Sequence, residues 1–224
     1  MKPLGFVPDF IDEDPGTFHH REVDVVDRAL WVPTLRPTRV LVLGSSQNDE
    51  DLNQETLDDR QISVARRRSG GGAVLVSEDD LVWFDVVIAK TDPLWVDDVS
   101  RSFDWLGEAV SHAMASLGIE TSVHHGPLVQ NNWSRRVCFA GLGPGELTVG
   151  GRKLVGMSQR RTRDWARFQV AVLRSWSGED HRSFFRVPAD EQADADDFLS
   201  EVATAVNDSP DDILAAVVEA LADY

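Results

Sequence analysis

Residues 66–74 of this 224-residue chain read Arg-Arg-Arg-Ser-Gly-Gly-Gly-Ala-Val. The apolar patterns on either side, at 61–67 and 73–76, predict two strands, so the three glycines connect them. Glycine lets the backbone turn with positive φ and approach a ligand closely. Its N–H groups, beside guanidinium groups, can hold a carboxylate or a phosphate. The stretch is not a P-loop, because no Gly-Lys-Ser/Thr follows it. A flexible hairpin without a ligand is the alternative interpretation.

A second stretch, residues 150–160, reads Gly-Gly-Arg-Lys-Leu-Val-Gly-Met-Ser-Gln-Arg. Its lysine, Lys153, is rare in this chain, because nearly all of the 22 basic residues are arginines. A chain that otherwise uses arginine favours an ammonium group where a compact charge must bond a single oxygen. A solvated lysine at the start of a strand is the alternative.

Cys138 is the only cysteine of the chain and lies between apolar neighbours. One cysteine excludes an internal disulfide and a multi-cysteine zinc site. Such a residue is more often a small buried hydrophobe than a nucleophile. The arginines at 135–136 would favour its thiolate if they converge on it in space. The adjacent histidines at 19–20 and 124–125 make poor chelates, and no HExxH motif is present, so we expect no metal site.

Apolar patterning predicts strands and helices at irregular intervals along the chain. The expected strands are residues 39–43, 61–67, 73–76, 81–89, 146–149, 154–159 and 168–174. The expected helices are residues 21–31, with Val23, Val26 and Leu30 on one face, residues 99–117, and a C-terminal helix that Ser209 caps and Pro210 begins. The first forty residues, with four prolines, otherwise predict a loose start. We therefore expect an α+β fold with a central mixed, mostly antiparallel sheet flanked by helices, and short acidic C-terminal helices.

The net charge of −16 argues against general nucleic-acid binding, which requires a basic face. Residues 190–224 carry many of the acidic side chains and no lysine or arginine, whereas basic residues cluster at 66–68, 135–136 and 152–167. A surface that is acidic overall and basic in one place predicts a site for an anion or an acidic partner. Scattered solvated arginines are the alternative.

Two further features bear on location. The longest nearly uncharged apolar stretch, residues 81–89, is too short to cross a bilayer. The N-terminal residues lack the apolar segment of a secretory signal. We therefore expect a cytoplasmic protein with no membrane partner.

The two glycine-containing stretches resemble motifs of the lipoate–protein ligase and octanoyltransferase family, which is related to the biotin–protein ligases. Residues 66–74 resemble the Arg-Arg-x-Ser/Thr-Gly-Gly-Gly acyl-binding loop of that family. Residues 151–159 resemble its Gly-Arg-Lys-x-x-Gly-Ser-Ala-Gln element, and residues 42–48 its Ile-Gly-x-x-Gln-Asn segment. Residues 137–153 are similar to the cysteine-bearing octanoyltransferases and amidotransferases. The resemblance covers roughly residues 38–175 and implies a fold like that of class II synthetases and biotin–lipoate ligases.

The resemblance also implies the site. Lys153 and Cys138 would be catalytic. The substrate-binding residues would be Arg66, Arg67, Ser69, Gly70, Gly71, Gly72, Gly156, Ser158 and Gln159. Residues 1–187 would form the catalytic domain, and residues 188–224 an acidic helical extension that is too short for the accessory domain of the ATP-dependent ligases.

Three functions remain open. The first is transfer of an octanoyl or lipoyl group to a lysine of a lipoyl carrier domain, through a Cys138 thioester, with Lys153 stabilising the acyl oxygen. The second is an ATP-dependent lipoate–protein ligase that works through lipoyl-adenylate, and the third is a non-catalytic binding protein. We expect no tightly bound cofactor; the substrate would be an octanoyl-carrier thioester or lipoate, with ATP and Mg²⁺ only for a ligase. The partners would be an acidic lipoyl carrier domain, an acyl carrier protein, or both.

The sequence departs from the family pattern in four places. Val76-Ser77 replace the His-Asp that often follows the triple glycine, and Gly126-Pro127 lie near the usual Asn-Asp. Gln169-Val170 stand where the strand after the lysine carries His-Gly. Met157 replaces a small serine, and we expect it to narrow the acyl or adenylate pocket. A divergent acceptor, a divergent donor or lost activity would each fit these departures.

Overall fold

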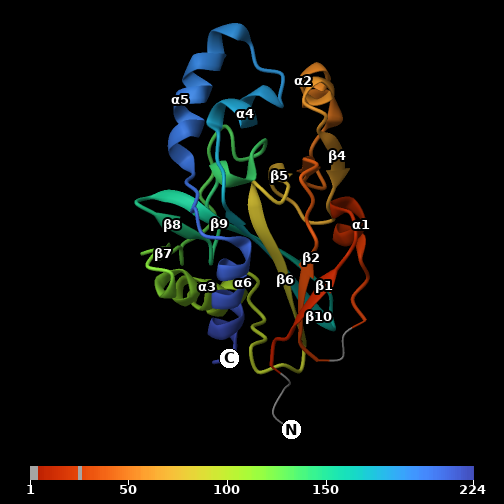
Figure 1. The fold of residues 1–224 in the computed structure, drawn as a ribbon, viewed down its shortest axis with the longest axis vertical. Coiled ribbons are helices and arrows are strands. Elements are labelled where there is room, and N and C mark those ends of the chain that lie inside the picture. The colour runs from red at the N-terminus through yellow and green to blue at the C-terminus, as the bar shows by residue number, and fades with distance from the viewer. Residues whose placement is uncertain (1–4, 25–26) are drawn as a thin grey trace.

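Two sheets form the centre of the protein in a computed structural model that describes residues 5–24 and 27–224. The larger sheet has seven strands in the order β1-β2-β6-β10-β9-β8-β7, and the smaller has three in the order β4-β3-β5 (Figure 1). The strands are β1 Pro8–Ile11, β2 Ala29–Pro33, β3 Val40–Leu43, β4 Ser63–Arg66, β5 Val74–Val76, β6 Leu81–Ala89, β7 Ser122–Val123, β8 Leu147–Val149, β9 Arg152–Arg161 and β10 Trp165–Leu173.

Six α-helices surround the sheets in the described part of the chain. They are α1 Pro15–His20, α2 Gln54–Asp59, α3 Asp104–Ser116, α4 Gly178–Ser183, α5 Gln192–Val202 and α6 Pro210–Leu221. Within residues 5–24 and 27–224, none of these helices has the length and apolar character that crossing a bilayer requires.

The larger sheet confirms the expected mixed, mostly antiparallel architecture. Its strands pair antiparallel except for β1 and β2, which run parallel. The central strand β6 is rich in β-branched and aromatic residues and is buried almost throughout, because helices cover one of its faces and the smaller sheet and α1 cover the other. The separate three-stranded sheet was not predicted, because alternation marks a strand but does not show which sheet it joins.

Helices α3 and α6 cover one face of the larger sheet and lie side by side (Figure 1). A 3₁₀ turn at Arg101–Phe103 precedes α3, so the helix predicted from residue 99 begins a few residues later. Ser209 caps α6 as predicted, and its Oγ accepts a hydrogen bond of 3.1 Å from the Asp212 N–H. The apolar stripe of α6 belongs to the same core as β6.

The predictions for the N-terminal region were wrong. Residues 21–24 are not helical, residues 29–33 form β2, and Val26 lies outside the described residues. The spacing of three and four in this region does not mark a helix, because Leu30 and Trp31 pair with Val86 and Asp85 of β6. The start of the chain is also not loose, since β1 pairs with β2 and α1 follows it.

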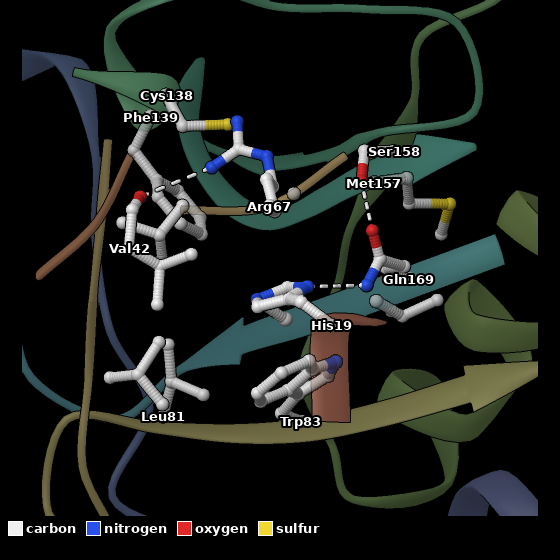
Figure 2. Close-up of a pocket in the computed structure, with 15 residues that line it drawn as sticks. His19, Val42, Arg67, Leu81, Trp83, Cys138, Phe139, Met157, Ser158 and Gln169 are labelled. Carbon is white, nitrogen blue, oxygen red and sulfur yellow. Dashed lines mark hydrogen bonds between the residues drawn. The ribbon is translucent and has the colours of Figure 1, made fainter. Parts of the chain in front are cut away.

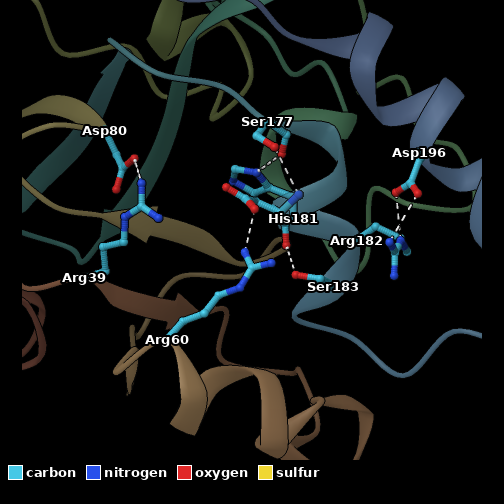
Figure 3. Close-up of polar contacts among 9 residues, drawn as sticks. Arg39, Arg60, Asp80, Ser177, His181, Arg182, Ser183 and Asp196 are labelled. Atoms are coloured by element: carbon cyan, nitrogen blue, oxygen red, sulfur yellow. Dashed lines mark hydrogen bonds and ion pairs between the residues drawn. The ribbon is translucent and has the colours of Figure 1, made fainter.

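The C-terminal helices pack on the body of the protein. Leu199 of α5 is buried in the core that the smaller sheet shares with α2 and α4, and the N–H of Thr204 donates to the Lys153 carbonyl at 3.0 Å. Ion pairs join α4 to its neighbours, with Arg60 on Asp180 and Arg182 on Asp196 (Figure 3). The division of the chain at residue 187 stays a prediction.

A buried ion pair joins α1 to the other face of the larger sheet. The Arg167 Nε of β10 donates to the Asp85 carboxylate of β6, and neither side chain is exposed. Arg167 also donates to the carbonyls of Phe18 at 2.8 Å and Arg21 at 3.1 Å, which belong to the C-terminal end of α1. Burial raises the pKa of Asp85, and the charge of Arg167 opposes that rise. The pair therefore fixes α1 against the sheet.

Breaking this pair should destabilise the fold strongly. Either Asp85→Leu or Arg167→Met leaves one buried charge without its partner, and each should lower the free energy of unfolding by about 3–5 kcal/mol. The double variant should lose much less than the sum of the two, as measured by urea denaturation. Additive losses would show that the two side chains are not coupled. Arg36→Met, which breaks the exposed pair of Arg36 with Asp12, is the matched control and should change stability little.

Candidate active site

An apolar cavity of about 50 Å³ lies between the two sheets. Strands β3 and β5 form one wall, β6, β9 and β10 form another, and α1 and the 3₁₀ turn Cys138–Ala140 complete it (Figure 2). The apolar lining residues are Val42, Val74, Val76, Leu81, Trp83, Phe139, Met157, Val170 and Ala171. The other lining residues are His19, Arg67, Cys138, Gly156, Ser158 and Gln169.

The triple-glycine loop brings Cys138 to this cavity. The Ala73 N–H donates to the Arg136 carbonyl at 2.7 Å, and the Cys138 N–H donates to the Ala73 carbonyl at 3.0 Å. A Cβ on Gly72 would lie 2.5 Å from the Val137 carbonyl carbon, so only glycine fits between the two chain segments. Two stretches that are far apart in the sequence therefore meet, and the contact is made by backbone.

Arg67 supplies a buried positive charge beside Cys138 (Figure 2). Its guanidinium donates to the carbonyls of Gly70 at 2.8 Å and Gly72 at 2.7 Å, and its buried Nε has no partner among the described residues. Burial lowers the pKa of Arg67, and a thiolate at Cys138 acts in the opposite direction. The cavity wall thus brings a thiol and a buried cation close together.

Lys153 lies behind the cysteine and does not line the cavity. Its Nζ donates to the carbonyls of Cys138 at 3.1 Å and Gly141 at 2.9 Å, and it pairs with Glu146 Oε2 at 2.6 Å. A bulge between β8 and β9 shifts the register at this point, and a Cβ on Gly156 would lie 3.4 Å from Lys153 Cε. The ammonium group therefore fixes the backbone of the cysteine segment.

Glu146 completes this arrangement. Its carboxylate accepts from the Gly143 N–H at 2.6 Å and from the Met157 N–H at 2.8 Å, in addition to pairing with Lys153. Both charged side chains are almost completely buried. Buried charges of this kind require a partner and hydrogen bonds, and here each has both.

The remaining predicted site residues fall into three groups. Ser158 lines the cavity, and the hydroxyls of Ser69 and Ser158 lie 3.2 and 3.3 Å from Gln169 Oε1, to which they donate. Gly70 and Gly71 are exposed in the loop. Arg66 and Gln159 point elsewhere: Arg66 donates to loop carbonyls at residues 44 and 47, and Gln159 donates to a serine at residue 102. Neither of them lines the cavity.

Sequence reasoning missed His19, Trp83 and Gln169. His19 Nδ1 lies 2.7 Å from Gln169 Nε2, and its ring lies over Trp83 with the centroids 4.4 Å apart. Gln169 occupies the position at which the resemblance places a histidine, and this replacement was the one sequence feature that pointed to a site residue here. Nothing in the sequence shows that a histidine from α1 would reach it.

Burial lowers the pKa of His19 well below 6.5, and the positive charges of Arg67 and Arg167 act in the same direction. Burial also lowers the pKa of His181. As the pH falls below 6.5 the unfolded chain binds more protons at both histidines than the folded chain does, so the folded state loses stability.

His19→Phe should therefore flatten the pH dependence of stability. Each such histidine contributes a slope of up to about 1.4 kcal/mol per pH unit below its unfolded pKa. Urea unfolding between pH 7 and pH 5 should show a shallower decline for His19→Phe than for the wild type. His181→Phe should also flatten the decline, because burial lowers the pKa of His181 in the same direction. An unchanged slope in His19→Phe would mean that His19 titrates normally in the folded protein.

Gly72→Ala should disturb the cysteine segment. The added methyl group meets backbone atoms of Val137 and Cys138 at 2.5–2.7 Å, and backbone cannot move aside without breaking the bridge to Ala73. We expect a loss of roughly 2 kcal/mol or more in the free energy of unfolding. Gly70→Ala is the matched control, since a Cβ there has open space and should cost less than about 1 kcal/mol. Equal losses for the two variants would contradict the close contact.

Comparison with known proteins agrees with this architecture. Residues 20–222 match the family described as the lipoyl protein ligase A/B catalytic domain. The octanoyltransferase LipM of Moorella thermoacetica is 27% identical over 164 residues, which are 70% of this chain and 59% of that protein. LipM of an Exiguobacterium species is 29% identical over 211 residues, 82% of this chain and 72% of that protein. The chain thus spans less than two thirds of the first relative.

Solved structures show the same fold. The bipartite lipoate protein ligase of Thermoplasma acidophilum, whose lipoylation system was solved with an E2 lipoyl domain, superimposes with a TM-score of 0.75 at 17% identity, covering 100% of this chain and 84% of that one. A lipoate-protein ligase A bound with ATP gives a TM-score of 0.69 at 18% identity, covering 100% and 85%. With nine tenths of its residues matched, the chain belongs to the lipoyl protein ligase A/B catalytic-domain family.

Proposed function

We propose that the protein is an acyltransferase of protein lipoylation. It takes an octanoyl or lipoyl group from a carrier thioester onto the Cys138 thiol and passes it to the ε-amine of a lysine on a lipoyl carrier domain. The observation that carries the proposal is the position of Cys138 in the wall of the apolar cavity, beside the buried charge of Arg67. The LipM relatives support the same reaction class.

The two steps are balanced thioester and amide exchanges. Cys138 Sγ attacks the donor carbonyl, and the donor thiol leaves with a proton. The acceptor amine then attacks the Cys138 thioester, so that an amide forms, the cysteine thiol is released, and a proton passes from the amine to it. An eight-carbon chain would occupy the apolar part of the cavity, where each buried methylene contributes about 0.8 kcal/mol.

Lys153 positions the nucleophile in this proposal. All of its hydrogen-bonding capacity goes to the Cys138 and Gly141 carbonyls and to Glu146. To stabilise the acyl oxygen directly, as the resemblance implies, the ammonium group would have to exchange one of these three bonds for the substrate. Arg67 Nε needs no such exchange, because it is buried without a partner among the described residues.

The partner in this proposal is an acidic carrier protein. Arg68 follows the cavity-lining Arg67 in the chain, and Arg160 lies two residues after the lining Ser158. Burial and the charge of Arg68 lower the pKa of Arg160, whose buried Nη1 has no partner in the described part of the chain. Arg68 already pairs with Glu22 at 2.8 Å, so an acidic surface docked here would chiefly compensate the charge of Arg160.

An ATP-dependent ligase is the second candidate. The same free donor of Arg67 would suit the phosphate of an acyl-adenylate, and one structural neighbour is a lipoate-protein ligase bound with ATP. That reaction requires ATP and Mg²⁺, and Cys138 would then be a packing residue of the cavity wall that forms no covalent intermediate.

Intact mass spectrometry distinguishes these functions. The wild type, incubated with an octanoyl-acyl carrier protein, should gain the mass of one octanoyl group, and hydroxylamine should remove it, because Cys138 is the only thiol. Cys138→Ser, which keeps the size and removes the thiolate, should show no hydroxylamine-labile adduct and no transfer to a lipoyl domain. A Cys138→Ser protein that releases pyrophosphate from lipoate, ATP and Mg²⁺ would establish the ligase instead. If the wild type shows neither acylation nor pyrophosphate release, the non-catalytic binding protein is the function that remains.

A further inference from the structure

A chain of hydrogen bonds crosses one side of the apolar cavity. The hydroxyls of Ser69 and Ser158 donate to Gln169 Oε1, and Gln169 Nε2 donates to His19 Nδ1 at 2.7 Å (Figure 2). Each of these side chains is buried or half-buried. Because the amide oxygen accepts from the serines, the amide nitrogen is oriented toward the histidine. The donor and the acceptor of each of these hydrogen bonds are therefore defined.

The hydrogen bond from Gln169 determines which nitrogen of His19 carries the proton. Nδ1 accepts a hydrogen bond, so the proton of the neutral ring lies on Nε2. The ring stays neutral, since burial lowers its pKa well below 6.5. Within the described residues Nε2 has no hydrogen-bond partner, and Figure 2 shows it directed into the space between His19, Val42 and Leu81. A donor therefore faces the apolar part of the cavity.

We propose that His19 is a specificity-determining residue, which selects acyl chains that carry a hydrogen-bond acceptor far from the carbonyl over unsubstituted octanoyl chains. The proposal rests on the proposed function, because it assigns the acyl chain to this cavity. The acceptor is a chain oxygen or the sulfur of a dithiolane ring. His19 itself lies just before residues 20–222, the range that matches the family.

The energetic reason is the cost of covering a donor. An unsubstituted acyl chain would exclude water from the Nε2–H group and leave that donor without a hydrogen bond. An acceptor on the acyl chain would replace the hydrogen bond lost to water. Sites that hydrogen-bond a substrate discriminate against analogues that lack the matching group. We expect chains with an acceptor to acylate Cys138 roughly 10- to 100-fold faster than octanoyl chains. The factor should be larger for an oxygen acceptor than for a sulfur acceptor, because sulfur is the weaker acceptor.

The test compares the rates at which three acyl thioesters of one small thiol acylate Cys138. The chains are octanoyl, octanoyl with a ketone near its far end, and lipoyl. The wild type should favour the ketone-bearing chain most and octanoyl least. His19→Phe keeps a ring over Trp83 and removes the donor, so it should bring the three rates close together.

His181→Phe is the matched control. His181 is as buried as His19 and stacks on Trp176, with the ring centroids 4.0 Å apart. It lies in α4 (Figure 3) and is not among the residues that line the cavity. It should lose a comparable amount of stability and keep the wild-type preference. If His19→Phe does not fold, the His19 imidazole nitrogen resonances decide: Nε2 should shift when the ketone-bearing acid binds the wild type and not when octanoate binds.

The outcomes separate the two proposals. Equal rates for the three chains in the wild type, or a preference that survives in His19→Phe, would overturn the role of His19 and leave acyl transfer intact. If no chain acylates Cys138 and none of the corresponding acids binds, the proposed function fails, and the role of His19 fails with it.

Discussion

The contact between the triple-glycine loop and the backbone at Val137–Cys138 is the constraint on which the site depends. It joins the smaller sheet to the segment that carries the thiol, through two hydrogen bonds on either side of Ala73. Since a Cβ at Gly72 would come within 2.7 Å of three backbone atoms, no other residue allows this approach. Gly72 thus serves a packing purpose, in addition to the anion-binding role that the sequence predicts for the loop.

Two buried ion pairs then position opposite walls of the cavity by the same device. In each, a carboxylate neutralises a cation whose other donors hold backbone carbonyls. Lys153, paired with Glu146, holds the carbonyl of Cys138, and Arg167, paired with Asp85, holds the carbonyls at the end of α1. Such pairs contribute little net stability compared with well-packed apolar residues. Their value here is geometric, because they fix segments that belong to no central strand.

The sequence predicted regular elements well where local composition, capping residues and apolar spacing agree. The strand at 81–89 and the helix capped by Ser209 needed only local patterns. The helix expected at 21–31 failed, because pairing with β6 overrode a local spacing. The motifs located Cys138 and Arg67 in the cavity wall but not the orientation of Lys153, since a bulge changes the face on which a side chain lies. His19 and Gln169 are 150 residues apart, and no local pattern encodes such a contact.

The placement of charge along the cavity gives it a direction. The guanidinium of Arg67 lies beside the thiol of Cys138, while the ring of His19 is kept neutral by burial and by the positive charges of Arg67 and Arg167 around it. An acyl group has a polar carbonyl at one end and a hydrocarbon chain at the other. Its carbonyl is best placed against the charged end, where developing negative charge is stabilised. In the proposed reaction the acyl chain would extend toward Trp83, and the neutral donor of His19 would meet whatever group the far part of that chain carries.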